Sequence, residues 1–124
     1  MALLALTEEN FQQIIADNEV VIIDFWATWC GPCKQYGPIF EKVAEETTGV
    51  TFAKINTDEQ QQLAAQFHIR SIPTTMIMKE EIIVYQQEGV LFHDQLVEIV
   101  NKAKTLDMEK VRMKLAEQEA AAQQ

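Results

Sequence analysis

The segment that most limits how this chain can fold is a short apolar run followed closely by its only two cysteines. Residues 20–26 are Val-Val-Ile-Ile-Asp-Phe-Trp, and a short run rich in β-branched residues is typical of a buried strand. From Tyr36 to Val43 the apolar residues recur at helical spacing, which predicts a helix. We therefore expect Cys30 in the loop between strand and helix, and Cys33 in the first helical turn.

A thiol at the start of a helix is chemically activated. The first helical amides have no intrahelical partner and the helix dipole adds positive potential, so the thiolate, which attacks disulfides, is favoured. Pro32 suits this turn because it has no amide hydrogen and its φ is already helical. Cys30 and Cys33 can also close a local disulfide, so the segment predicts redox chemistry. The alternative is half of a zinc site, but only His68 and His93 remain as His or Cys ligands, without ligand-like spacing.

Length and charge restrict the kinds of partner. A chain of 124 residues is long enough for one domain with a core and too short for two. The net charge of −9 argues against nucleic acid and anionic membrane as partners. The apolar run 2–6 has no basic flank and is too short for a signal peptide or a membrane span. With two cysteines and no leader, we expect a redox or metal role in a reducing cytoplasm.

Periodicity predicts alternating strands and helices up to residue 104. We expect strands at 3–6, 20–26, 51–56, 74–79 and 82–86, and helices from a Thr7 N-cap to 17, from the cysteines to about 47, at 59–67 and at 95–104. Helices between the early strands imply parallel pairing, and the late hairpin implies antiparallel pairing. The predicted fold class is α/β, with a mixed central β-sheet flanked by helices on both faces.

Residues 105–124 differ in kind from the rest and are rich in Ala, Glu, Gln and Lys. Met108, Val111 and Leu115 share a helical stripe that is displaced from the stripe of the preceding helix. Either the helix breaks near Asp107, which could cap a new one, or one long helix runs through. We expect a solvated helix that frays, and docking or self-association of this segment remains an alternative.

Over about residues 3–104 the chain resembles the thioredoxin family. The matching positions are 24–27, the Trp-Cys-Gly-Pro-Cys-Lys segment 29–34, Pro38, 53–56, Asp58, 69–70, the Ile-Pro-Thr segment 72–74, and Gly89. The resemblance implies the thioredoxin fold, with a domain at 1–104 and a C-terminal helical extension at 105–124.

Cys30 is the expected nucleophile and Cys33 the resolving thiol, acting through a mixed disulfide with the substrate. Asp24 is an acid in an otherwise apolar strand, so its pKa should be raised. The resemblance implies that Asp24 accepts the proton of Cys33 and that Lys54 lies beside Asp24. The alternative is that Asp24 and Lys54 form only a structural polar pair.

The resemblance also implies a substrate groove beside the cysteines. It implies a cis peptide before Pro73, in a loop whose backbone pairs with an extended substrate segment. The other residues expected to line the groove are Trp29, Gly31, Pro32, Ile72 and Gly89. Three further residues are expected to support the site: Trp26 beneath it, Asp58 near the indole N–H of Trp26, and Pro38 inside the following helix.

The expected function is that of a protein-disulfide reductase and electron carrier. The resemblance implies that a thioredoxin reductase, an NADPH-linked flavoenzyme, recharges it, and that protein disulfides are its substrates. We expect a cytoplasmic monomer that itself binds no cofactor and no metal. The alternatives are a thioredoxin-fold interaction module with a secondary redox role, and an exported oxidase or isomerase. The missing leader and the Gly-Pro pair between the cysteines argue against the exported enzyme.

Some positions depart from the family pattern. Ser71 stands where a glycine is common, and Glu88 and Thr57 are more polar than usual near the expected docking surface. These residues suggest a preference for basic partners. Glu80 and Glu81 occupy the expected hairpin turn, where Asn-Gly would suit a primed turn better.

Overall fold

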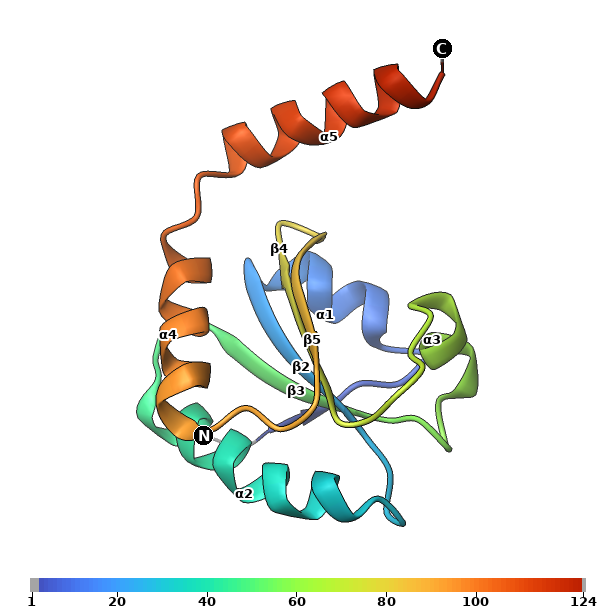
Figure 1. The fold of residues 1–124 in the computed structure, drawn as a ribbon, viewed down its shortest axis with the longest axis vertical. Coiled ribbons are helices and arrows are strands. Elements are labelled where there is room, and N and C mark those ends of the chain that lie inside the picture. The colour runs from blue at the N-terminus through green and yellow to red at the C-terminus, as the bar shows by residue number, and fades with distance from the viewer. Residues whose placement is uncertain (1–2, 124) are drawn as a thin grey trace.

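A computed structural model describes residues 3–123, in which five strands form one mixed sheet between two layers of helices (Figure 1). The strands are β1 (Leu4–Ala5), β2 (Val20–Trp26), β3 (Thr51–Asn56), β4 (Thr74–Lys79) and β5 (Ile82–Glu88). Their order is β1-β3-β2-β4-β5, with β1 and β2 parallel to β3, and β4 antiparallel to both β2 and β5. The predicted mixed sheet is confirmed.

The helices are α1 (Phe11–Asp17), α2 (Gly31–Glu46), α3 (Gln61–Gln66), α4 (His93–Lys104) and α5 (Met108–Ala122). One core joins α2 and α4 to the sheet, and a second core joins α1 and α3 to its other face. Neighbouring residues of β2 alternate between the two cores, with Ile22 in the first and Ile23 in the second. Burial on both faces explains why the central strand is an uninterrupted apolar run rather than an alternating one.

Strands β2, β3 and β4 have the predicted bounds, whereas several other boundaries were wrong by a few residues. The largest error is at α1, which begins at Phe11 and not after Thr7. The amide of Thr7 donates to Asn10 Oδ1 (2.7 Å) and the amide of Asn10 donates to Thr7 Oγ1 (3.2 Å), which closes a turn before the helix. The smaller differences are a shorter β1 and α3, a β5 that runs to Glu88, and an α4 that begins at His93.

The β4–β5 turn adopts a left-handed backbone at both of its residues. Glu80 has a φ of 50° and Glu81 a φ of 66°, which is the geometry of a type I′ turn. The tight connection therefore forms without the Asn-Gly pair that favours it. The Glu80 carboxylate pairs with the guanidinium of Arg112 on α5.

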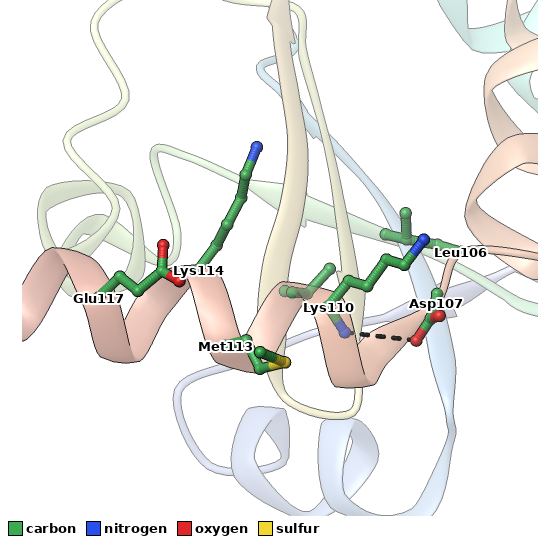
Figure 2. Close-up of a pocket in the computed structure, with 7 residues that line it drawn as sticks. Leu106, Asp107, Lys110, Met113, Lys114 and Glu117 are labelled. Atoms are coloured by element: carbon green, nitrogen blue, oxygen red, sulfur yellow. Dashed lines mark hydrogen bonds between the residues drawn. The ribbon is translucent and has the colours of Figure 1, made fainter.

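Of the two alternatives for residues 105–124, the structure shows a break between two helices, since α4 ends at Lys104 and α5 begins at Met108. Asp107 caps α5, since its carboxylate accepts the amide hydrogens of Glu109 (3.0 Å) and Lys110 (3.3 Å). Most of α5 is exposed. The pocket along its first part is lined only by residues between Leu106 and Glu117 (Figure 2).

A buried lysine holds the junction between α4 and α5. Lys79 is 4% exposed, and its Nζ donates to the carbonyls of Ala103 (2.8 Å), Lys104 (3.1 Å) and Leu106 (3.0 Å). The carbonyls of Ala103 and Lys104 end α4, where helical carbonyls lack intrahelical partners and a cation is favoured, and that of Leu106 lies in the turn before α5. Lys79, the last residue of β4, therefore ties the sheet to the point where the extension begins.

None of the helices within residues 3–123 has both the length and the apolar character needed to cross a membrane.

Candidate active site

Cys30 and Cys33 form a disulfide at the start of α2, just after the loop that follows β2. Cys30 is the residue that caps α2, and its Sγ accepts the amide hydrogen of Cys33 (3.1 Å). Pro32 lies in the first turn, as predicted. An amide hydrogen at a helix start that points at sulfur stabilises negative charge on that sulfur, so the reduced Cys30 is placed to be a thiolate.

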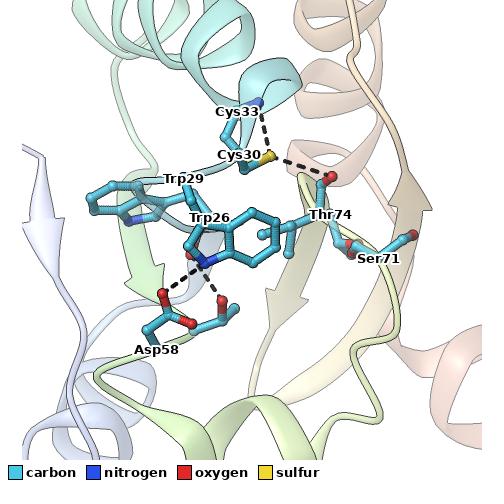
Figure 3. The surroundings of a disulfide bond; sticks show 9 residues. Trp26, Trp29, Cys30, Cys33, Asp58, Ser71 and Thr74 are labelled. Atoms are coloured by element: carbon cyan, nitrogen blue, oxygen red, sulfur yellow. Dashed lines mark hydrogen bonds between the residues drawn. A yellow bond between two sulfur atoms is a disulfide. The ribbon is translucent and has the colours of Figure 1, made fainter.

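A second loop lies against the disulfide. The peptide bond between Ile72 and Pro73 is cis, as the resemblance implied. The carbonyl oxygen of Ile72 lies 3.7 Å from Cys30 Sγ (Figure 3). The Gly89 amide donates to the Pro73 carbonyl (2.8 Å), and its φ of 94° is one that glycine tolerates best. The 72–73 loop is therefore tied to the end of β5.

A side-chain contact also joins these two segments. The Ser71 hydroxyl bonds to the Glu88 carboxylate, and the Thr74 hydroxyl donates to the Ser71 carbonyl (2.5 Å). Two of the residues that depart from the family pattern, Ser71 and Glu88, therefore interact directly at the rim of the site.

The expected partner of Asp58 was wrong. The indole of Trp29, and not that of Trp26, donates to Asp58 Oδ2 (2.8 Å). Trp29 lies in the loop before Cys30 and is 68% exposed, so its ring can reach the loop that follows β3. Trp26 ends β2, and its ring lies beneath the ammonium of Lys54, 4.8 Å from the ring centroid.

Asp24 is the buried acid that the sequence predicted. It is 1% exposed, and neither carboxylate oxygen has a hydrogen-bond partner among residues 3–123. Burial raises the pKa of Asp24 from 3.8 to about 7, opposed by the charge of Lys54. Asp24 and Lys54 are register partners on β2 and β3, and Lys54 lines one pocket together with Cys33. The site thus holds an acid that exchanges its proton near neutral pH.

Sequence reasoning missed a pair of buried hydroxyls on the same face as Asp24. Tyr36 of α2 and Thr75 of β4 are both fully buried, and their oxygens are 2.7 Å apart. Thr75 is the register partner of Asp24 across β2 and β4. Helical spacing placed Tyr36 in the core, but no pattern in the sequence indicates that its hydroxyl lies beside the acid.

Two further expected site residues belong to α2, and His93, which was not expected to act, begins α4. Gly31 opens α2, and Pro38 lies inside α2 and lines the pocket that Cys33 and Lys54 share. His93 contacts Asp94 and Glu46 on the surface. Within residues 3–123 no group of three or more His, Cys, Asp or Glu side chains could hold a metal ion.

A disulfide at the start of a helix, beside a cis-proline loop in a five-stranded mixed sheet, defines the class of thiol–disulfide oxidoreductases with this fold. A thioredoxin family model matches residues 2–102. The chain belongs to the thioredoxin family.

Relatives and solved structures agree with this assignment. The chain is 50% identical to a putative thioredoxin 2 of Streptomyces coelicolor over 117 residues, covering 94% of this chain and 87% of the relative. It is 37% identical to a thioredoxin of Haemophilus influenzae over 101 residues, covering 80% and 94%. The crystal structure of Malassezia sympodialis thioredoxin has a TM-score of 0.74 at 35% identity, covering 82% and 90%. A mutant thioredoxin from Halobacterium salinarum has a TM-score of 0.78 at 31% identity, covering 86% and 98%.

The Streptomyces match leaves fewer than ten residues of this chain unmatched, so it extends into α5, beyond the end of the family model. Family membership together with the Cys30–Cys33 pair makes the chain a thiol–disulfide oxidoreductase that reduces protein disulfides by dithiol–disulfide exchange.

Proposed function

We propose that Cys30 is the nucleophile and Cys33 the resolving thiol of this reductase. The Cys30 thiolate attacks one sulfur of a substrate disulfide, the substrate S–S bond breaks, and the leaving sulfur takes a proton. Cys33 then loses its proton and attacks Cys30 Sγ, which releases the second substrate sulfur as a thiolate that takes a proton from water. The protein ends with the Cys30–Cys33 disulfide, and the substrate has gained two electrons and two protons. The main support is the Cys33 amide hydrogen, which points at Cys30 Sγ from 3.1 Å.

Asp24 takes the proton of Cys33 in the resolving step. A carboxyl with a pKa of about 7 can both accept and release a proton at neutral pH. Lys54 favours the ionised, accepting form of Asp24, since its charge opposes the effect of burial. Asp24→Asn should therefore slow the resolving step more than it weakens substrate binding, and an unchanged rate of resolution would remove this role.

The substrate lies as an extended segment against the 72–73 loop and pairs with its backbone. The residues assigned to this groove are Trp29, Gly31, Pro32, Ile72, Pro73 and Gly89. The proximity of the Ile72 carbonyl to Cys30 Sγ supports this position. Asp58 fixes the exposed Trp29 ring, while Trp26 and Pro38 support the site from beneath.

We assign residues 1–104 to the thioredoxin domain and 105–124 to a helical extension, since α4 ends at Lys104 and the chain turns before Asp107. The protein acts as a cytoplasmic monomer in electron transport and cell redox homeostasis. An NADPH-linked flavoenzyme of the thioredoxin reductase type returns it to the dithiol form. The support for these assignments is family membership.

The reduction of insulin disulfides, driven by NADPH and a thioredoxin reductase, tests the proposal. The wild type should turn over, whereas Cys30→Ser should not, because the attacking sulfur is absent. Cys33→Ser should accumulate a mixed disulfide between Cys30 and insulin, visible on a non-reducing gel. Met113→Ala is the control, since Met113 is exposed on α5 and should leave turnover unchanged. Turnover that survives in Cys30→Ser would overturn the proposal.

A further inference from the structure

The surroundings of Asp24 leave its charge without a fixed hydrogen-bond donor. Lys54 faces it from β3, and α2 packs on the same face of the sheet with Cys33, Tyr36 and, at the pocket, Glu41. From the other side, β4 presents the hydroxyl of Thr75. Burial above all raises the pKa of Tyr36, and Tyr85 of β5 is near enough to raise it further. A buried carboxylate without a donor is costly, so a donor within reach would alter how readily Asp24 ionises.

Thr75 is within reach because of sheet register. Asp24 and Thr75 are directly opposed in the antiparallel pair of β2 and β4. Opposed residues in such a pair point to the same face, with Cβ atoms about 5 Å apart. A Cβ separation of this size is one that a carboxylate and a hydroxyl on opposed residues can span with a hydrogen bond.

A count of hydrogens shows that one donor is free. Tyr36 and Thr75 carry two hydroxyl hydrogens, and only one of them lies between their two oxygens. Within residues 3–123 neither hydroxyl has any other hydrogen-bond partner. If Tyr36 donates to Thr75, the Thr75 hydrogen is left to donate elsewhere, and Asp24 is the unsatisfied acceptor on that face.

We propose that Thr75 is a positioning residue for Asp24. Tyr36 holds Thr75 in place, and the Thr75 hydroxyl donates to the Asp24 carboxylate when Asp24 is ionised. The inference rests on the proton-accepting role proposed for Asp24. When Asp24 is protonated, the same hydroxyl oxygen can accept the acid hydrogen, so Thr75 serves both states. Because a hydrogen bond to a charged group is the stronger of the two, Thr75 holds the pKa of Asp24 lower than burial alone would.

The test is a titration of the Asp24 carboxyl carbon by NMR in the full oxidised chain. Thr75→Val keeps the shape and removes the hydroxyl, so it should raise the pKa of Asp24 by about one unit, the shift typical of losing one hydrogen bond to a charge. Thr75→Ser keeps the hydroxyl and should restore the wild-type value. Tyr36→Phe/Thr75→Val should match Thr75→Val, since Tyr36 acts through Thr75.

Thr51→Val is the matched control, because Thr51 bonds to Asn18 at the far end of β3. A pKa of Asp24 that moves no more in Thr75→Val than in Thr51→Val, or that moves down, would overturn the proposal. If Thr75→Val does not fold, Thr75→Ala carries the same decision, since it also removes the hydroxyl and must raise the pKa of Asp24 above the value in Thr75→Ser.

The titration does not depend on turnover, so its failure is distinct from a failure of the reductase assay. In single-turnover reduction, the pH dependence assigned to Asp24 should move upward in Thr75→Val. It should be absent in both Asp24→Asn and Asp24→Asn/Thr75→Val. A purely structural role of Thr75 would slow the reaction equally at every pH, and that result would contradict the inference.

Discussion

Replacing Asp24 with asparagine should stabilise the oxidised protein by an amount that grows with pH. The carboxyl is 1% exposed, and burial raises its pKa from 3.8 to about 7. Between these pH values the unfolded chain has released a proton that the folded chain still holds. Stability therefore falls as pH rises through this interval. The ionisation of Asp24 costs nothing well below pH 3.8 and has its full cost above about pH 7.

The size of the effect follows from the two pKa values. Each unit of difference corresponds to about 1.4 kcal/mol, so the full cost is about 4 kcal/mol above pH 7, and about 2 kcal/mol at pH 5. Asparagine has nearly the same shape and no charge at any pH. Its amide differs from the protonated acid by a contribution that is constant with pH, which shifts the curve without changing its slope.

Urea unfolding of the two oxidised proteins between pH 4 and 8 measures this difference. The gain of Asp24→Asn over wild type should increase through the interval and level off near pH 8. Asp17→Asn is the control, because it makes the same chemical change at an exposed position. A stability difference between Asp24→Asn and wild type that is flat with pH, or that shrinks as pH rises, would refute the reasoning.

Three further results are expected. Lys79→Met should lower the free energy of unfolding by about 2–3 kcal/mol, since it leaves one buried and two part-buried carbonyls without their charged donor. Lys102→Met on the surface should have little effect in the same urea titration. Glu81→Gly should raise the melting temperature, because the positive φ of Glu81 costs about 1 kcal/mol that glycine does not incur. A lower melting temperature would contradict this. Contacts with Asp94 and Glu46 raise the pKa of His93, so its contribution is present below the ordinary histidine pKa and is lost as pH rises through the raised value. His93→Gln should therefore lose stability at pH 5 to 6 and not at pH 9.

Local patterns were sufficient for the elements that depend on burial. Strand 74–79 is buried throughout and strand 20–26 is buried up to Phe25, so the apolar residues within each run indicated both strands. Asp24 stood out for the same reason, as one acid in an apolar run. The start of α1 was not predictable in this way, because Thr7 caps a separate turn through Asn10 before the helix begins.

Contacts between distant segments were beyond the sequence patterns. The choice between Trp26 and Trp29 as the partner of Asp58 depends on how two loops meet, and spacing along the chain does not contain that information. The pairing of Asp24 with Thr75 depends on the register of β2 against β4, where a shift of one residue would turn Thr75 to the other face.

The position of α5 has a practical consequence. It leaves the body beside the β4–β5 turn, at the end of the sheet opposite the beginning of α2 (Figure 1). A fluorophore or a resin linker attached through Met113→Cys would therefore stand far from the reactive sulfurs. Coupling to the oxidised chain, in which Cys30 and Cys33 are protected by their disulfide, would direct the label to α5 and leave the groove unobstructed.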